Sequence, residues 1–507
     1  HRTLRAVVDW SYDLLGDSER RIFVWLSVFA GDWNLEAAAA ICAAQGIGDE
    51  DVVALVASLV DKSMVMAPTH DGPGRYRLLE ILRQYGAERL DARGETGWAG
   101  RAHAEHFLAL AETAAVGLRG PDERTWVLRL RLDLDNLRAA HAWCCRHGDV
   151  DFALRLSAAL HRFAFWQAND EIFTWAAAAT ELDGAGGHPL LSTVLGSAGM
   201  GAYRRGELDK AIVLAERGLA AATDTDDPAR AQPFEVLGEV WSHHGRLDEA
   251  FAAYQEAARL GRATDEQHTV VFNLAGQAVV RAYSGDVQTG LSLADEVHRM
   301  ARESRNPTAL AWSHYLGGEI LLEEEPARAL ALLEESLKLA TSVDNVFVTG
   351  LALLSATSLR GRHGESERAL RAYRQAIEHW RRHGNWTQQW ITLRNLIELL
   401  CRVDAHQPAA ALYGATTASI TAPPTYGPES QRLDKAVAFL ETAMGRTAFE
   451  AATRRGTTLT DNEVLILATT TIDRVLAQMT ACADGWLRSG RRYSGRPVVA
   501  KHSADAG

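Results

Sequence analysis

Polar and aromatic side chains recur at fixed distances before a series of turn-like breaks, and binding is the chemistry that they could do. The breaks recur every 39 or 40 residues and centre on Gln167, Gly206, Gly245, Gly285, Glu324, Gly364 and Asp404. Positions 3, 6 and 10 residues before a break share one face of a helix. Seven candidates for a binding groove stand there: His161, Tyr203, Glu235, Glu239, His314, Arg394 and Glu398.

No catalytic or metal-binding motif accompanies these residues. G-x-x-x-x-G-K-[ST], H-E-x-x-H, C-x-x-C and G-x-S-x-G are all absent from the sequence. The glycine-rich stretch GMGAYRRG at Gly199 follows no predicted strand, so it is not interpreted as a phosphate-binding loop. We therefore expect a binding protein rather than an enzyme, with no cofactor or metal held by this chain.

Composition favours a helical chain of several domains or repeats. Its 507 residues exceed the usual size of one domain, and proline is scarce at 13. The net charge of −12 gives no basic footprint for nucleic acid. The five scattered cysteines imply no disulfide framework. Because no signal peptide or apolar stretch of membrane-spanning length stands out, we expect a cytoplasmic protein without membrane contact.

The repeating unit resembles a tetratricopeptide repeat, most closely around Gly245. The small and aromatic positions of that motif are occupied by Leu237, Gly238, Trp241, Gly245, Ala250, Tyr254 and Ala257. Small residues let two antiparallel helices approach closely. The period exceeds the usual value of about 34, so we expect helices longer by about one turn. The resemblance implies an all-α fold, with a right-handed superhelix of helical hairpins whose groove binds a protein, a peptide or a small effector; hairpins of another kind would stack similarly.

The first 93 residues have the pattern of four helices followed by two short strands. Helices are predicted at 1–16, 19–31, 35–44 and 50–62, with a cap for the second at Asp17 and Ser18. Strands are predicted at 63–67 and 75–80, around a loop at 68–74. This order is the outline of a winged helix. The fourth helix is acidic apart from Lys62, so we do not expect it to bind DNA.

Four stretches of this region resemble the winged-helix segment of signal-transduction ATPases with numerous domains (STAND, NB-ARC type). They are WSYDLL at 10–15, RIFVWLSVFAG at 21–31, SLVDKSMV at 58–65 and RYRLLEILRQYG at 75–86. The resemblance is to actinobacterial regulators in which helical repeats follow the ATPase module, often with a LuxR-type DNA-binding or adenylate-cyclase domain attached. It implies ATP or ADP and Mg²⁺ only in an upstream domain absent from this chain. The nucleotide-sensing Met-His-Asp motif of the family corresponds to Leu78, Leu79 and Glu80, with Leu79 replacing the histidine.

The domain boundaries follow from these patterns. The stretch TAPPTYGP at 421–428 separates the repeats from helices predicted at 431–445, 446–456 and 460–477, and the sequence beyond Gly485 lacks periodicity. We predict a winged helix at 1–93, a helical connector at 94–150, the repeat array at 151–422, C-terminal helices at 423–484 and a flexible tail at 485–507.

Together these features lead to one hypothesis and two alternatives. The chain is expected to be the sensor and regulatory arm of a STAND-type transcriptional regulator, in which an effector bound to the repeats changes how the winged helix packs on a nucleotide-binding domain in cis. Because the sequence opens at His1 within what has the pattern of a domain, we expect a fragment. The alternatives are a stand-alone scaffold that joins two proteins, and DNA binding through the winged helix or the basic tail.

Overall fold

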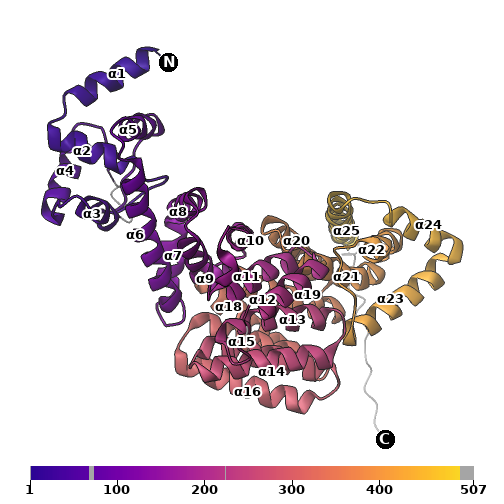
Figure 1. Cartoon of the computed structure of the whole chain (residues 1–507). Helices are drawn as coiled ribbons and strands as arrows, with labels where there is room; N and C mark the ends of the chain where they lie inside the picture. Colours follow the sequence, from indigo (N-terminus) through magenta and orange to yellow (C-terminus); the bar gives the residue numbers. More distant parts are fainter. Residues whose placement is uncertain (1, 68–73, 223, 491–507) are drawn as a thin grey trace, which may run out of the picture. The chain divides into compact units, whose positions relative to one another are not determined.

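The computed structural model describes residues 2–67, 74–222 and 224–490, most of which lie in helices (Figure 1). Within these ranges the only β-structure is two isolated bridges. Contacts divide the chain into two compact units. Unit 1 comprises His1–Ala352, His383–Thr387 and Pro423–Gly427, and unit 2 comprises Leu353–Arg382, Gln388–Ala422 and Pro428–Gly507.

The N-terminal module of unit 1 contains the four predicted helices, and a fifth helix follows the predicted strands. Its helices are α1 (Arg2–Asp13), α2 (Asp17–Leu26), α3 (Leu35–Ala43), α4 (Asp49–Asp61) and α5 (Glu80–Ala92). Antiparallel bridges join Trp33 to Tyr76 and Met66 to Arg77. Of the two predicted strands, only Met66, Tyr76 and Arg77 form bridges, and Glu80 begins α5. Tyr76 pairs with Trp33, which lies between α2 and α3 and was not predicted to be part of a strand. The predicted loop at 68–74 lies outside the described residues except for Gly74.

The carboxylate of Glu19 caps the start of α2 and also forms hydrogen bonds with α4 and its C-cap. Gly16 is the N-cap, and its N–H donates to Glu19 Oε2 at 2.6 Å. Lys62 Nζ and Ser58 Oγ also donate to Glu19, at 2.6 and 2.5 Å, and these bonds lower the pKa of Glu19 to about 2. The predicted cap at Asp17 and Ser18 was wrong because Glu19 caps the backbone from inside the helix.

Helices in antiparallel pairs make up the rest of unit 1 (Figure 1). They are α6 (Thr96–Gly117), α7 (Glu123–Leu132), α8 (Leu134–His147), α9 (Val150–Gln167), α10 (Asp170–Thr180), α11 (Leu191–Arg204), α12 (Leu208–Ala221), α13 (Ala231–His243), α14 (Leu247–Ala263), α15 (Gln267–Tyr283), α16 (Val287–Ser304), α17 (Pro307–Ile320) and α18 (Pro326–Ser342). Short 3₁₀ turns lie at Ala185–Gly187 and Pro228–Arg230.

Unit 2 continues the helical pairs and adds the C-terminal helices. Three helices are divided between the units: α19 (Val346–Arg362), α21 (Trp386–Arg402) and α23 (Gly427–Met444). Unit 2 contains most of α19, α21 and α23, together with α20 (Ser366–Arg382), α22 (His406–Ala418), α24 (Arg446–Gly456) and α25 (Asp461–Gly490). Because α25 extends to Gly490, the tail predicted from residue 485 begins inside a helix. Residues 491–507 lie outside the described residues.

Left-handed backbone recurs with the predicted period. Within the helix pairs it occurs at Ala168, Gly206, Gly245, Gly285, Gly364 and Asp404, with φ of 52°, 78°, 71°, 96°, 98° and 56°. Between the pairs it occurs at Asp265, Arg305, Asp344 and Gly384, with φ of 56°, 52°, 55° and 63°. A residue in this conformation ends a helix and reverses the chain, and glycine adopts it without a Cβ clash. Among the predicted breaks, the one at Glu324 has no such residue, and Pro326 begins the next helix there.

The close approach predicted from Gly238 is present. A Cβ on Gly238 of α13 would lie 2.6 Å from the Tyr254 ring of α14, and a Cβ on Gly276 of α15 would also lie 2.6 Å from it. Tyr254 is therefore held between two glycines on successive first helices of the repeats. Ala257 is fully buried one turn further along α14. Helices of 17 or 18 residues, such as α14, α15 and α16, account for the long period.

One described helical segment is apolar and long enough to cross a membrane. Asp461–Ala481 of α25 meets that test by length and composition, and 33% of its most apolar window is buried within the structure. The expectation that no stretch approaches this length was wrong. The finding is weak evidence for a membrane, since a partly buried helix of a core passes the same test.

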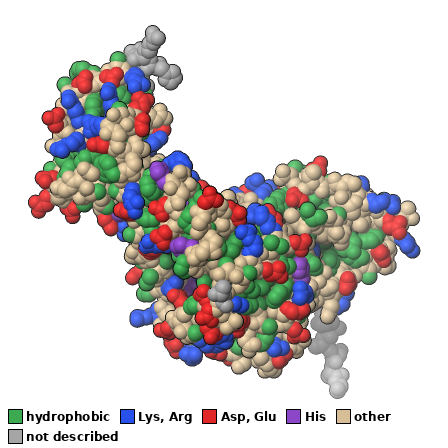
Figure 2. All heavy atoms as spheres, viewed as in Figure 1, with side chains coloured by type: hydrophobic (Ala, Val, Ile, Leu, Met, Phe, Trp, Pro, Cys, Tyr) green, Lys and Arg blue, Asp and Glu red, His purple; other side chains and the backbone are tan. Residues whose placement is uncertain are grey.

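Charged side chains of both signs are interspersed over the face of the molecule shown in Figure 2. Many are ion pairs one helical turn apart, such as Arg299 with Glu303 at 2.8 Å and Arg371 with Glu367 at 2.8 Å. Exposed pairs of this kind contribute little to stability. The fold therefore depends on the buried small-residue contacts rather than on surface charge.

Gly238→Ala is expected to destabilise unit 1, because the added methyl group would overlap the Tyr254 ring. Overpacking typically costs about 1–3 kcal/mol. Urea unfolding followed by circular dichroism should show a lower midpoint. The matched control is Gly186→Ala, whose Cβ would meet no atom within 4 Å. Equal midpoints for the two variants would contradict the close approach.

Candidate functional site

Polar side chains converge where the first helices of several repeats meet in unit 1. We name them the inner cluster: His161, Arg162, Trp166, Glu235, His268, Asn273 and Trp312. At its centre Glu235 is only 1% exposed. Glu235 Oε1 accepts hydrogen bonds from Arg162 Nη2 and Asn273 Nδ2, each at 2.9 Å. The helices α9, α13 and α15 are thus joined through one carboxylate oxygen.

Six buried atoms of the inner cluster have no hydrogen-bond partner among the described residues. They are His161 Nε2, Trp166 Nε1, Glu235 Oε2, His268 Nε2, Asn273 Oδ1 and Trp312 Nε1. The indole nitrogens can only donate, whereas the carboxylate and amide oxygens accept. A buried polar atom left unsatisfied costs about 1–3 kcal/mol. Several such atoms in one place therefore favour a bound group, or water, that offers both donors and acceptors.

An aromatic wall adjoins these polar atoms. The Trp166 ring lies 5.7 Å from that of Trp312 and 6.1 Å from those of His268, Phe272 and Phe347. Phe272 and Trp312 are stacked with an interplanar angle of 8°. Rings at these separations are in favourable contact. The cluster consequently presents an apolar surface next to its hydrogen-bonding groups.

The two histidines of the cluster are held neutral. Burial lowers the pKa of His161 and His268 well below the ordinary value, and the positive charge of Arg162 adds to the effect on both. His161 Nδ1 lies 2.9 Å from Ser197 Oγ. Each imidazole can therefore offer one donor and one acceptor rather than a charge.

Tyr203 and Glu239, also predicted for the groove, belong to a neighbouring polar group in unit 1. Glu239 accepts hydrogen bonds from Tyr254 and Tyr203, yet burial raises its pKa to about 7. The Tyr203 hydroxyl lies 3.4 Å from His243 Nε2. These residues form a second titratable centre on the same repeats.

The predicted boundary loop packs on this second group. Tyr426 of Pro423–Gly427 places its ring 6.0 Å from that of His243 and 5.6 Å from that of Tyr283. A Cβ on Gly245 would lie 3.4 Å from Tyr426 Cβ. The loop thus covers the ends of α13 and α15 instead of serving only as a linker.

The other three groove candidates lie elsewhere. The His314 ring is 5.2 Å from that of His298 on α16. In unit 2, Arg394 Nε donates to Glu429 Oε1 at 3.1 Å, and Glu398 lies 3.9 Å from Arg432. Of the candidates selected by the interval of 3, 6 and 10 residues, only His161 and Glu235 therefore belong to the inner cluster.

Sequence reasoning missed most of the inner cluster. Asn273 and Trp312 each stand 12 residues before a break, and His268 stands further out still. These positions lie in the N-terminal part of α15 and α17, further from the break than the positions 3, 6 and 10 that were used for the prediction. The long period was the available signal, because a longer first helix adds residues to the same face.

The counterparts of the nucleotide-sensing motif lie at the start of α5. Leu79 is the N-cap and is 48% exposed. Glu80 accepts hydrogen bonds from Arg83 at 2.8 Å and Gln84 at 2.7 Å, which lower its pKa to about 2. Leu78 is partly buried. Their role in sensing a nucleotide stays a prediction.

A buried carboxylate fastens the connector to the repeats. Glu123, the first residue of α7, accepts hydrogen bonds from Asn306 Nδ2 at 3.1 Å, from the Thr308 N–H at 3.0 Å and from the Thr308 hydroxyl. Asn345 Nδ2 donates to Thr308 Oγ1 at 2.8 Å. Glu123 is 2% exposed, and burial raises its pKa to about 7. We call this set of contacts the connector latch.

A second set of contacts joins the connector to the N-terminal module. Asn136 Oδ1 accepts from the N–H groups of Ala30 and Gly31 at 3.0 and 3.3 Å, and Asn136 Nδ2 donates to Asp32 O at 2.8 Å. Arg75 pairs with Asp133 at 2.5 Å, and both side chains are less than a tenth exposed. Unit 1 therefore contains a continuous path from the module, through α7 and α8, to the repeats.

Comparisons with known proteins give relatives of part of the chain. No protein-family model matches it. It is 32% identical over 316 residues to "Putative HTH-type transcriptional regulator Mb0914c" of Mycobacterium bovis, which covers 59% of this chain. The chain spans only 35% of that protein's length.

Two solved structures are similar at low sequence identity. One is a STAND protein with a tetratricopeptide repeat sensor, PH0952 from Pyrococcus horikoshii, at a TM-score of 0.49 and 12% identity, covering 91% of this chain and 66% of that one. The other is a Rap protein complexed with competence and sporulation factor, at a TM-score of 0.41 and 13% identity, covering 74% and 99%. Both TM-scores lie below 0.5, so neither similarity establishes a function.

Glu123→Ala should loosen the connector latch, because Asn306 and Thr308 would lose a buried acceptor. Losing such a partner costs about 1–3 kcal/mol. Hydrogen–deuterium exchange should become faster across Glu123–Leu132 of α7. Glu303→Ala is the control, since its pair with Arg299 is exposed. Unchanged exchange in α7 of the Glu123 variant would rule out the latch.

Glu239→Gln is expected to change how stability depends on pH. The pKa of Glu239 is raised from 4.5 to about 7 on folding, so the folded state retains a proton that the unfolded state releases. The wild-type free energy of unfolding should therefore fall between about pH 4.5 and about pH 7, and the variant should lose this contribution. Urea midpoints across that range test it. A constant difference between the two proteins at all pH values would contradict the raised pKa.

Proposed function

We propose that the chain is the sensor and regulatory arm of a STAND-type transcriptional regulator, and that its repeats bind a peptide or protein partner. The observation that carries the binding role is the inner cluster, with six buried unpartnered atoms beside an aromatic wall. The name of the Mycobacterium bovis relative, a transcriptional regulator, supports the regulatory setting. The bridge order at Trp33, Met66 and Tyr76 supports a winged helix at the N-terminus.

A peptide fits the chemistry of the inner cluster. Each peptide unit offers one donor and one acceptor, which complement Glu235 Oε2 and Asn273 Oδ1 on one side and the two indole N–H groups on the other. An apolar side chain of the peptide would lie against Trp312, a partly exposed ring of the aromatic wall. A small effector with an amide group offers the same donor and acceptor. It is therefore the alternative ligand in this proposal.

The proposed mechanism uses the path through the connector. A ligand that binds one arrangement of α9, α13 and α15 more tightly shifts the equilibrium toward it. The connector latch transmits the change to α7, and Asn136 and Arg75 transmit it to the N-terminal module. An attached nucleotide-binding domain would then sense the packing of the winged helix. ATP or ADP and Mg²⁺ belong to that domain in this proposal.

Peptides selected from a random library on the full chain test the binding role. Glu235→Gln keeps the volume of the side chain but removes its charge, and it should weaken the selected peptides by about tenfold. The control is Glu303→Gln, an exposed carboxylate of α16. If the selected peptides bind both variants as tightly as the wild type, the inner cluster is not the binding site.

The codons upstream of His1 test the regulatory setting. A strand followed by G-x-x-x-x-G-K-[ST] is the expected finding, because that loop holds the phosphates of a nucleotide. With such a domain attached, the peptide should change the affinity for ATP, and Glu123→Ala should remove that coupling while preserving peptide binding. A start codon close to His1 without this loop would favour the stand-alone scaffold.

A further inference from the structure

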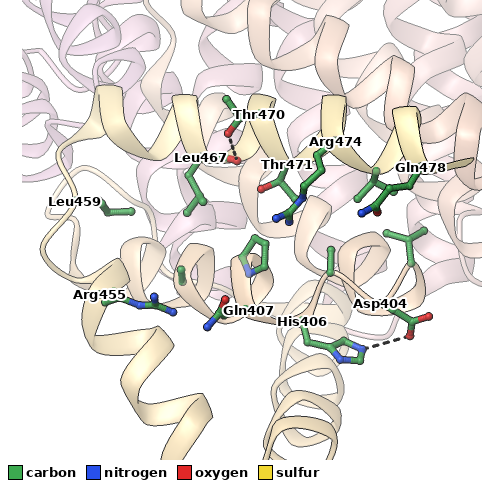
Figure 3. Close-up of a pocket in the computed structure, with 15 residues that line it drawn as sticks. Asp404, His406, Gln407, Arg455, Leu459, Leu467, Thr470, Thr471, Arg474 and Gln478 are labelled. Carbon is green, nitrogen blue, oxygen red and sulfur yellow. Dashed lines mark hydrogen bonds and ion pairs between the residues drawn. The ribbon is translucent and has the colours of Figure 1, made fainter. Parts of the chain in front are cut away.

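A concave site lies in unit 2, where α22, α24 and α25 meet. It is an open pocket with a volume of about 640 Å³, lined by the first turn of α22, the end of α24 and one face of α25 (Figure 3). Arg455 of α24 and Arg474 of α25 both point into it, and Gln407 of α22 lies between them (Figure 3). Pockets of about 300–1,000 Å³ are typical of small-molecule sites.

The two arginines differ from their neighbours in being unpaired. In unit 2, Arg374 pairs with Asp473 at 2.7 Å, Arg446 with Glu450 at 2.9 Å and Arg381 with Glu378 at 2.8 Å. Arg455 and Arg474 have no ion pair or side-chain hydrogen bond within the part of the chain that the structure describes. Their guanidinium groups therefore remain available to an anion.

The backbone of α22 adds to the positive potential. Its N-cap is Ala405, which has no side chain to bond the first-turn N–H groups. Uncapped N–H groups at a helix N-terminus attract anions. His406 Nε2 is buried and pairs with Asp404 Oδ1 at 3.6 Å, so it is not counted among the groups available to an anion. Asp404 is the one acid among the residues that line the pocket, and it is 93% exposed at the end away from Arg455 (Figure 3).

The remaining wall is apolar. It is formed by Val403, Pro408, Ala411, Leu459, Leu467 and Val475. Thr471 and Gln478 of α25 supply neutral polar groups beside Arg474 (Figure 3). An adjoining hollow of about 590 Å³ shares Gln407 and Arg455 and adds Arg454, which extends the basic side of the site.

We propose that this pocket binds a small ligand in which a phosphate group is joined to an apolar portion. Arginine forms bidentate hydrogen bonds with phosphate. Two guanidinium groups from different helices and a helix N-terminus supply more donors than the two oxygens of a carboxylate would use, whereas a phosphate monoester has three free oxygens. The apolar wall takes the rest of the ligand. The proposal does not rest on the proposed function, because it concerns other residues in the other unit.

Titration of the full chain with phenyl phosphate and with inorganic phosphate, followed by calorimetry, tests the proposal. Phenyl phosphate should bind more tightly than inorganic phosphate, because its ring can pack against the apolar residues that line the pocket. Arg455→Ala and Arg474→Ala should each weaken phenyl phosphate by about tenfold, as expected for one lost charge-assisted contact. Both side chains are exposed, so the variants should keep the wild-type circular dichroism and melting temperature.

Arg446→Ala is the matched control, because Arg446 belongs to α24 but pairs with Glu450 outside the pocket. It should bind phenyl phosphate like the wild type. Three results would overturn the proposal: no binding of phenyl phosphate, equal loss in the Arg446 variant, or equal affinity for phenylacetate, which replaces the phosphate by a carboxylate.

Discussion

The close approach of helices at Tyr254 is the contact on which the repeat structure depends. This ring is held between Gly238 and Gly276, and neither glycine leaves room for a Cβ. Because Tyr254 of α14 touches both α13 and α15, it sets the spacing of these three helices. The short spacing brings side chains of α13 and α15 together, as in the hydrogen bond of Asn273 with Glu235.

That spacing has a consequence for the polar residues of unit 1. The first helices α9, α13 and α15 come near enough for one oxygen of Glu235 to accept from Arg162 and Asn273 together. The same proximity buries more polar atoms than the described residues can satisfy. An array that needed only to be stable would be better served by apolar residues at these positions. The unsatisfied atoms are thus more readily explained by binding than by folding.

The connector gives the repeats a mechanical link to the N-terminal module. Glu123 ties α7 to the start of α17, while Asn136 and Arg75 tie the following helix to the module. Each junction is buried and uses several hydrogen bonds to one side chain. A displacement of the repeats can therefore be transmitted to the N-terminal module through buried contacts rather than through a flexible linker. A regulatory arm requires transmission of this kind.

The sequence by itself determined the helical class, the period of 39 or 40 residues and the first four helices of the N-terminal module. Glycines and apolar periodicity act over a few residues, so the turns at Gly206, Gly245 and Gly285 could be placed from local pattern. The sequence also supplied His161 and Glu235. Only the tertiary structure decided that Arg162, His268, Asn273 and Trp312 join them, that Glu123 contacts Asn306, and that Arg394 belongs elsewhere. These pairings join residues far apart in sequence, and their geometry depends on how much each successive helix is rotated against the last, which no local pattern records.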